Sequence, residues 1–417
     1  MEDIVYKGKI VHGNTTVLAT VTISNGIITG VYGPLHSVQG QVELDFTEEN
    51  KYVLIPGVID IHAHLMGLKY SYKEDGESGL SAAGSGGIVV VVDSPNTLPQ
   101  VKSVSVLEEK LKSYVRENAP EYYCYAGVPD SVEEAWMLAK HCRVLGFEVI
   151  PEDLENIDMI SNIAKIAAST GKIIVFNSAQ MRSSEERCEA GFRWIDRSIK
   201  VEREYIKRVL EITEDTGVRV HFTHMTCRSG VLLAKIGGAT VDTSPHYLLL
   251  DCDHEKSMKC LAKVDPPLRP EDIVEGLVEA LIEGWIDAIT SNHTPHSVDE
   301  KSLEFNKCPP GIPGLETLIP LMWTFVEYGV ISIKEFVNLT SRRPAEILGL
   351  KGYGSITPGS PASLTIINIG EEFTINPAEF KSKAKYSPFK GLRLKGKPSL
   401  TIVKGNIVFS EDELNCI

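Results

Sequence analysis

The chain has 417 residues, of which 43% are apolar and 24% are charged, a composition typical of a folded protein with a large core. Fifty-six acidic and 42 basic residues give a net charge of −14. This charge argues against binding to nucleic acid or to an anionic membrane, because no basic excess can neutralise phosphates. The apolar runs are shorter than the roughly 20 residues of a membrane-spanning helix. Small molecules and other proteins are therefore the expected partners.

The eight cysteines are scattered along the chain and form no Cys-x-x-Cys pair. This spacing gives neither the signature of a zinc ribbon nor that of a disulfide-rich secreted domain. We therefore expect reduced, mostly structural thiols in a cytoplasmic protein.

Both ends of the chain are rich in short β-type runs. Residues 1–56 alternate such runs with Gly-Asn and Asn-Gly turn signals, and the same texture returns in SLTIINIG and SLTIVKGNIVF near the C-terminus. Chain termini often lie close together in space. Residues 1–56 and 351–417 are therefore predicted to form one small β domain.

Between the two ends, residues 57–350 alternate short β-branched runs with longer amphipathic segments. GGIVVVVDSP precedes VSVLEEKLKSYVREN, for example, and KIIVFNS and VRVHFTHMT are each followed by a helical pattern. About eight such units predict a (β/α)8 barrel of the TIM type, with its chemistry at the C-terminal ends of the strands.

The strongest chemical signal is IPGVIDIHAHLMG, in which His62 and His64 lie two residues apart at the end of a β-branched run. Residues two apart on a strand point to the same side, so both imidazoles can reach one metal ion. His224, in VRVHFTHMT, also follows an apolar run and would project toward the same centre. A strand end with unrelated histidines is the alternative.

A series of motifs in chain order resembles the dihydroorotase and allantoinase branch of the amidohydrolase superfamily. They are PGVIDIHAHL, AAGSGGIVVVVDSPNTLP, TSPHYLLL, KVDPPLRPED, IDAITSNHTPH, PPGIPGLETLIPLM and SRRPAEILGL. SPNT and VDPPLR look most like dihydroorotase. The resemblance implies a barrel with a small β-sandwich and, in active relatives, a two-zinc site that hydrolyses or closes a cyclic amide in pyrimidine biosynthesis.

In such relatives the metals are held by a His-x-His pair, a carboxylated Lys, two further His and an Asp that also transfers protons. The resemblance places His62, His64 and His224 at three of these six positions. The other three depart from the pattern. LGFEV supplies Glu148 for the bridging Lys, VFNS supplies Asn177 for a His, and SNHTPH supplies Asn292 for the Asp.

Each departure weakens the chemistry. Glu148 is anionic but shorter than a carboxylated Lys, and the amide of Asn177 is a poor zinc ligand. Asn292 has no titratable proton near neutral pH and cannot act as an acid or base. We therefore expect at most one zinc ion per chain, held by His62, His64 and Glu148, with a site that binds no metal tightly as the alternative.

The residues at the family's substrate-binding positions are kept in part and replaced in part. The resemblance places Asn96 and His296 against the pyrimidine ring and its carboxylate. Met66 stands where relatives carry an Arg that clamps the carboxylate. Asp265 stands where an Asn often precedes PPLR, and it would repel an anionic substrate unless protonated or paired. His246, in SPHY, is predicted to belong to the scaffold.

Four family groups are replaced together: the catalytic Asp, the bridging Lys, one His ligand and the substrate-binding Arg. Their joint replacement favours a homologue that is inactive or weakly active. Such a chain could serve as a non-catalytic subunit of aspartate carbamoyltransferase, as some inactive dihydroorotase-like chains do, and we expect a homo-oligomer, a dimer or a tetramer. The alternatives are a one-metal cyclic-amide hydrolase and a hydrolase of an uncharged cyclic substrate. A nearby acid such as Asp93 or Asp251 could also have replaced the missing base.

Overall fold

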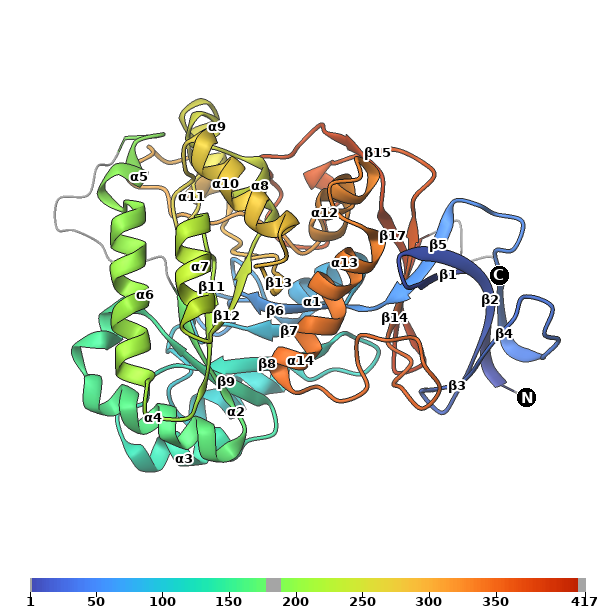
Figure 1. Ribbon diagram of the computed structural model, residues 1–417, viewed down its shortest axis with the longest axis horizontal. Helices are drawn as coiled ribbons and strands as arrows, with labels where there is room; N and C mark the ends of the chain where they lie inside the picture. Colours follow the sequence, from blue (N-terminus) through green and yellow to red (C-terminus); the bar gives the residue numbers. More distant parts are fainter. Residues whose placement is uncertain (1, 178–188, 412–417) are drawn as a thin grey trace.

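A computed structural model describes residues 2–177 and 189–411 of the chain. Its centre is an eight-stranded parallel sheet whose strands pair in chain order, with helices packed around it (Figure 1). The predicted (β/α)8 barrel is therefore confirmed. Its strands are β6 (Val58–Ala63), β7 (Ile88–Asp93), β8 (Glu121–Ala126), β9 (Val144–Val149), β10 (Ile173–Asn177), β11 (Arg219–Thr223), β12 (Thr240–Thr243) and β13 (Ala288–Ile289).

The strands form because their β-branched runs are buried on both faces, as a sheet covered by helices requires. All six residues of β7, IVVVVD, are buried, for example. The helices that follow the strands are α1 (Gly76–Ser85), α2 (Val104–Tyr114), α3 (Val132–Lys140), α4 (Ile157–Thr170), α6 (Ile199–Thr213), α7 (Arg228–Ile236) and α10 (Glu271–Ile282). Side chains of Asp75, Ser103 and Ser131 cap the first three of these helices at their N-termini.

Seven further α-helices, most of them short, complete the described part of the chain. They are α5 (Arg193–Asp196), α8 (Pro245–Leu249), α9 (Cys252–Met258), α11 (Val298–Lys301), α12 (Leu318–Glu327), α13 (Ile333–Val337) and α14 (Arg343–Leu348). No helix in the described part of the chain is both long and apolar enough to cross a membrane.

The first and last strands of the barrel are joined by a few specific bonds instead of a continuous ladder. The amide of His64 donates to the carbonyl of His293 over 2.7 Å. The carboxylate of Asp60 accepts from the amide of Ser291 over 3.1 Å and also from its hydroxyl. The segment that follows β13 therefore lies directly beside the end of β6, and Ser291 contacts Asp60, 231 positions earlier in the sequence.

A second sheet combines both ends of the chain (Figure 1). Strand β5 pairs with β1 on one side and with β14 on the other, which joins the N-terminal to the C-terminal strands. The strands are β1 (Glu2–His12), β2 (Thr15–Ser24), β3 (Ile27–Tyr32), β4 (Gly40–Asp45), β5 (Tyr52–Pro56), β14 (Leu364–Asn368), β17 (Lys397–Val403) and β18 (Asn406–Ser410). A separate two-stranded ladder joins β15 (Phe373–Thr374) and β16 (Arg393–Leu394).

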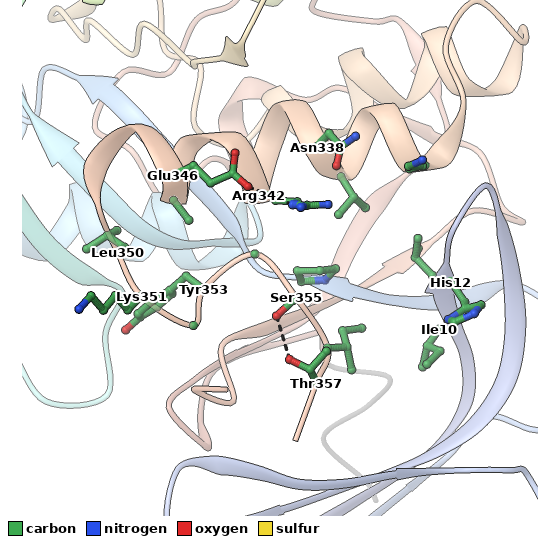
Figure 2. Close-up of a pocket in the computed structure, with 18 of the residues that line it drawn as sticks. Ile10, His12, Asn338, Arg342, Glu346, Leu350, Lys351, Tyr353, Ser355 and Thr357 are labelled. Atoms are coloured by element: carbon green, nitrogen blue, oxygen red, sulfur yellow. Dashed lines mark hydrogen bonds and ion pairs between the residues drawn. The ribbon is translucent and has the colours of Figure 1, made fainter. Parts of the chain in front are cut away.

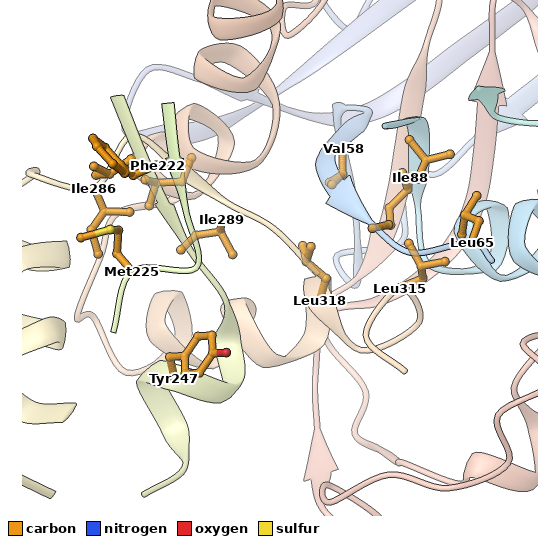
Figure 3. Close-up of a cluster of buried hydrophobic side chains, with 14 of the residues drawn as sticks. Val58, Leu65, Ile88, Phe222, Met225, Tyr247, Ile286, Ile289, Leu315 and Leu318 are labelled. Carbon is orange, nitrogen blue, oxygen red and sulfur yellow. The ribbon is translucent and has the colours of Figure 1, made fainter. Parts of the chain in front are cut away.

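Three apolar cores stabilise these units. One lies inside the terminal sheet and includes Tyr6, and another is made mainly by barrel strands and includes Val90. The largest core packs the barrel strands against the helices, and Figure 3 shows part of it, from Val58 to Phe222 and Ile289. Packed side chains thus fix the strands from whose ends the site residues project.

The expectation that all cysteines are reduced is wrong for one pair. Cys260 and Cys308, 48 residues apart in the sequence, form a disulfide. It links the segment before Val264 to the segment before Pro309, and this pairing of distant loops has no signature in the sequence. Cys124, Cys142, Cys227 and Cys252 are thiols, while Cys188 and Cys416 lie outside the described residues.

Candidate active site

A cavity of about 280 Å³ opens at the C-terminal ends of the barrel strands. Eight of the ten predicted site residues line it, although they come from six separate stretches of the chain. They are His64, Met66, Asn96, Asn177, His224, Asp265, Asn292 and His296. The other two, His62 and Glu148, are buried next to this group at the ends of β6 and β9.

Three histidines converge beside the cavity. One ligand nitrogen from each of His62, His64 and His224 lies within 4.8 Å of the others, and the rings of His62 and His224 meet edge to face with centroids 4.4 Å apart. Within the described part of the chain, Nδ1 of His62 and Nδ1 of His64 are buried without a hydrogen-bond partner. Buried imidazole nitrogens in this arrangement fit a metal ion.

Glu148 contacts the same cluster. Its Oε1 lies 3.1 Å from Nε2 of His62, and both side chains are buried. Burial alone would lower the pKa of His62 and raise that of Glu148, but their mutual attraction outweighs it, so the pKa of His62 is raised and that of Glu148 is lowered. Each partner therefore stabilises the charged form of the other.

Asp242 positions the third histidine, and sequence reasoning did not single it out. Its Oδ1 accepts from the amide of His224 over 2.9 Å and from the hydroxyl of Thr223 over 3.1 Å. Its Oδ2 lies 2.9 Å from Nε2 of His221. Asp242 is adjacent to β11 because β11 pairs with β12, so knowledge of the strand order would have been the signal that reveals it.

Three residues at the cavity have left-handed backbone conformations. The φ angles are 60° at Met66, 61° at His224 and 47° at Asn292. Non-glycine residues seldom adopt this conformation, and they cluster at functional sites where the surrounding structure imposes it. The surrounding structure therefore imposes an uncommon backbone conformation at three of the residues that line the cavity.

Asp265 is paired by two arginines, which resolves how the cavity tolerates its charge. Arg197 forms an ion pair with Oδ1 of Asp265, and a nitrogen of Arg193 lies 3.7 Å from the same oxygen. Both arginines belong to α5 or follow it directly. The sequence offered no signal for this contact, because Arg197 and Asp265 are 68 residues apart and neither lies in a strand of the repeated pattern.

His296 is held in one tautomer. Its Nε2 lies 2.9 Å from the carbonyl of Pro310, which can only accept, so Nε2 carries the proton. Its Nδ1 then accepts from Nζ of Lys73 over 3.1 Å. Burial, together with Lys73 and Lys301, lowers the pKa of His296 to about 3, which makes this side chain neutral.

Neither alternative acid lines the cavity. Asp93 is buried and is engaged by Lys110 at 2.5 Å, by the Tyr122 hydroxyl at 2.9 Å and by the amide of Leu65 at 2.8 Å. Asp251 caps the N-terminus of α9. Neither side chain has therefore taken the place of the missing base in this conformation.

A larger cavity of about 780 Å³ lies elsewhere, between β1 and the segment from α13 to Thr357 (Figure 2). It contains Arg342, Tyr353 and Ser355 but none of the ten predicted site residues. The smaller cavity is the candidate site because it gathers the residues that carry chemistry.

His246 is buried on α8, and its ring lies 4.2 Å from that of Tyr247. Burial lowers its pKa to about 3. A lowered histidine pKa means that the unfolded chain binds the proton more tightly, so this contribution to stability is present above about pH 6.5 and is lost as the pH falls toward 3. His246→Phe is expected to reduce the pH dependence of the free energy of unfolding by ~1.4 kcal/mol per pH unit in this range. Chemical denaturation at several pH values measures the slope, and an unchanged slope would contradict the assignment.

The fold and this site agree with comparisons to known proteins. The family model described as the amidohydrolase family matches residues 53–408, so the chain belongs to that family. The dihydroorotase of Aeropyrum pernix is 34% identical over 380 residues, covering 89% of this chain and 87% of the relative. The dihydroorotase of Syntrophus aciditrophicus is 31% identical over 94% of both chains. Within the family this is therefore a dihydroorotase-like cyclic amidohydrolase chain.

Solved structures show the same architecture. The L-hydantoinase (dihydropyrimidinase) of Arthrobacter aurescens superposes with a TM-score of 0.90 at 24% identity, covering 98% of this chain and 96% of that one. The dihydropyrimidinase of Brevibacillus agri gives a TM-score of 0.84 at 21% identity, covering 98% and 95%. At these identities the likeness shows the fold alone.

Proposed function

We propose that this chain is a dihydroorotase-family homologue that keeps the ligand cavity but hydrolyses cyclic amides weakly or not at all. One observation carries this proposal. Among the described residues that line the cavity, Asp265 is the single carboxylate, and Arg197 engages it. Asn292 stands at the position of the family's proton-transferring Asp and has no titratable proton near neutral pH.

The residues present fit one metal ion better than two. His62, His64 and His224 offer three imidazole nitrogens, with Glu148 beside His62, and three protein ligands suffice for a single zinc. When bound, zinc would supply a Lewis acid. Asn177, at the position of a family His, offers only an amide to a second ion.

Metal content and turnover test the proposal together. The purified protein is expected to hold at most one zinc per chain and to hydrolyse dihydroorotate at least about 10²-fold more slowly than an active dihydroorotase assayed alongside. His62→Asn should remove the zinc, whereas His246→Phe, a buried histidine outside the cluster, should retain it. Two metals per chain with turnover near that of the active enzyme would overturn the proposal.

A one-metal hydrolase of an uncharged cyclic amide is the second candidate. The convergence of three buried histidines favours it, because three protein ligands leave the fourth position of a single zinc ion open for water or substrate. Zinc-dependent hydrolysis of dihydrouracil, lost in His62→Asn, would support this candidate over the first.

We further infer a role for the chain as a non-catalytic subunit, which rests on its resemblance to inactive dihydroorotase-like subunits. Co-purification of the untagged chain with a tagged aspartate carbamoyltransferase from the same source tests this role. Recovery of either protein alone would contradict it.

A further inference from the structure

The wall of the candidate cavity carries one cation. Among the described residues that line it, Lys73 is the sole lysine or arginine. Its side chain is 11% exposed, so its position is set by its contacts. At Met66, where the resemblance expects the arginine that clamps a carboxylate, the side chain is apolar and 4% exposed.

Two contacts fix the Lys73 ammonium. Nζ lies 2.9 Å from Oε1 of Glu300 and 3.1 Å from Nδ1 of His296. Because His296 donates from Nε2 to the Pro310 carbonyl, its Nδ1 can accept from Lys73, and the positive charge resides on the lysine. The aromatic rings of Tyr70 and Tyr72 lie 5.1 Å and 5.7 Å from the same Nζ.

Glu300 orients Lys73 but occupies only one of the hydrogen-bond donors of the lysine ammonium. The other carboxylate oxygen of Glu300, Oε2, accepts from the amide of Ser297 over 2.9 Å and from its hydroxyl over 3.1 Å, in a capping box at the start of α11. An ammonium has three N–H donors. Glu300 and His296 take two of them, and the third can turn from the neighbouring Tyr72 hydroxyl to a ligand on the cavity side.

We propose that Lys73 binds the carboxylate of a cyclic-amide ligand and so replaces, from a new position in the chain, the arginine that is absent at Met66. This inference rests on the proposed function only in using the same cavity. Asn96, Asn292 and Thr294 line that cavity as well and provide neutral donors and acceptors for the amide groups of the ring. The ligand class is therefore a cyclic amide that carries a carboxylate.

Orotate and uracil form a matched pair of probes, because they share the ring and differ in the carboxylate. Calorimetric titration of the full chain is expected to show tighter binding of orotate than of uracil. Lys73→Met should weaken orotate binding at least about tenfold, the scale of one charge-assisted hydrogen bond, and leave uracil binding unchanged. Lys73→Arg should retain the preference for orotate.

Two further variants separate a ligand contact from a structural one. Lys69→Met removes an exposed lysine that does not line the cavity and should change neither affinity. Glu300→Gln keeps the capping box, in which Gln serves as well as Glu, but removes the negative charge beside Lys73. It should raise orotate affinity about threefold or more.

Equal affinities for orotate and uracil, or equal losses for both probes in Lys73→Met, would overturn the role of Lys73. Thermal unfolding of each variant shows whether a loss of binding reflects a loss of folding. If Lys73→Met does not fold, the affinity of Lys73→Arg for orotate and for uracil decides whether the positive charge binds the carboxylate. These outcomes do not depend on turnover. Rapid hydrolysis of dihydroorotate would overturn the proposed function and leave the binding comparison valid.

Discussion

Replacement of Lys110 by Met is expected to lower the free energy of unfolding by ~3–5 kcal/mol, the scale of breaking a buried ion pair by removal of one partner. Nζ of Lys110 and the carboxylate of Asp93 lie 2.5 Å apart and are fully buried. The variant would leave Asp93 charged and buried with only the Tyr122 hydroxyl and the Leu65 amide as donors.

This ion pair also supports the site. The amide of Leu65 donates to Asp93, and the carbonyl of Leu65 accepts from the hydroxyl of Tyr114 over 2.7 Å. Leu65 directly follows His64, so Lys110→Met is also expected to weaken zinc retention. Urea denaturation and zinc analysis measure the two effects.

The double variant Asp93→Asn with Lys110→Met provides the control, because it removes both charges. It should recover at least about half of the lost stability, since an unpaired buried charge costs more than a neutral pair of similar volume. A loss below ~1 kcal/mol in the single variant would show that Asp93 is readily neutralised or hydrated.

Restoration of the family residues at four positions is expected to produce the largest functional change. Glu148→Lys, Asn177→His, Asn292→Asp and Met66→Arg together should raise zinc from at most one to two ions per chain and increase dihydroorotate turnover at least about 10²-fold. Asn292 has a φ of 47°, a conformation that Asp tolerates nearly as well as Asn. The backbone therefore accepts the restored base without rearrangement.

The triple variant without Asn292→Asp separates metal binding from catalysis. It should gain metal but remain slow, because the proton-transferring carboxylate is still missing. A quadruple variant that folds and binds two zinc ions without any gain in turnover would show that the rest of the cavity, including Lys73 and the Asp265 pair, no longer accepts dihydroorotate productively.

The fold was predictable because its signal is repeated. Parallel strands buried on both faces require continuous apolar runs such as IVVVVD, and eight alternations with helical patterns leave few topologies. The convergence of His62, His64 and His224 follows from the same rhythm, because the C-terminal ends of parallel barrel strands meet at one face.

The contacts that tune the site were not predictable by the same route. Lys73, Arg197 and the Cys260–Cys308 disulfide lie in the connections between the barrel strands, where no periodicity indicates which distant residue will be adjacent. Asp265 shows the difference: its position was identified from VDPPLR, but its charge balance depends on an arginine about 70 residues earlier. A local sequence motif can locate a site residue such as Asp265, but the charged groups that surround it are known only from the tertiary structure.

The hydrogen bonds that close the barrel, between the end of β6 and the segment after β13, affect which substitutions the chain can accept during evolution. These bonds involve the backbone of His64 and His293 and the Asp60–Ser291 pair. None of them uses the side chains of Met66, Glu148, Asn177 or Asn292. Substitutions at those four positions therefore leave barrel closure intact, so selection for catalysis can relax without an accompanying loss of the folded state. A lineage can in this way keep a stable scaffold available for a new role after its original chemistry has gone.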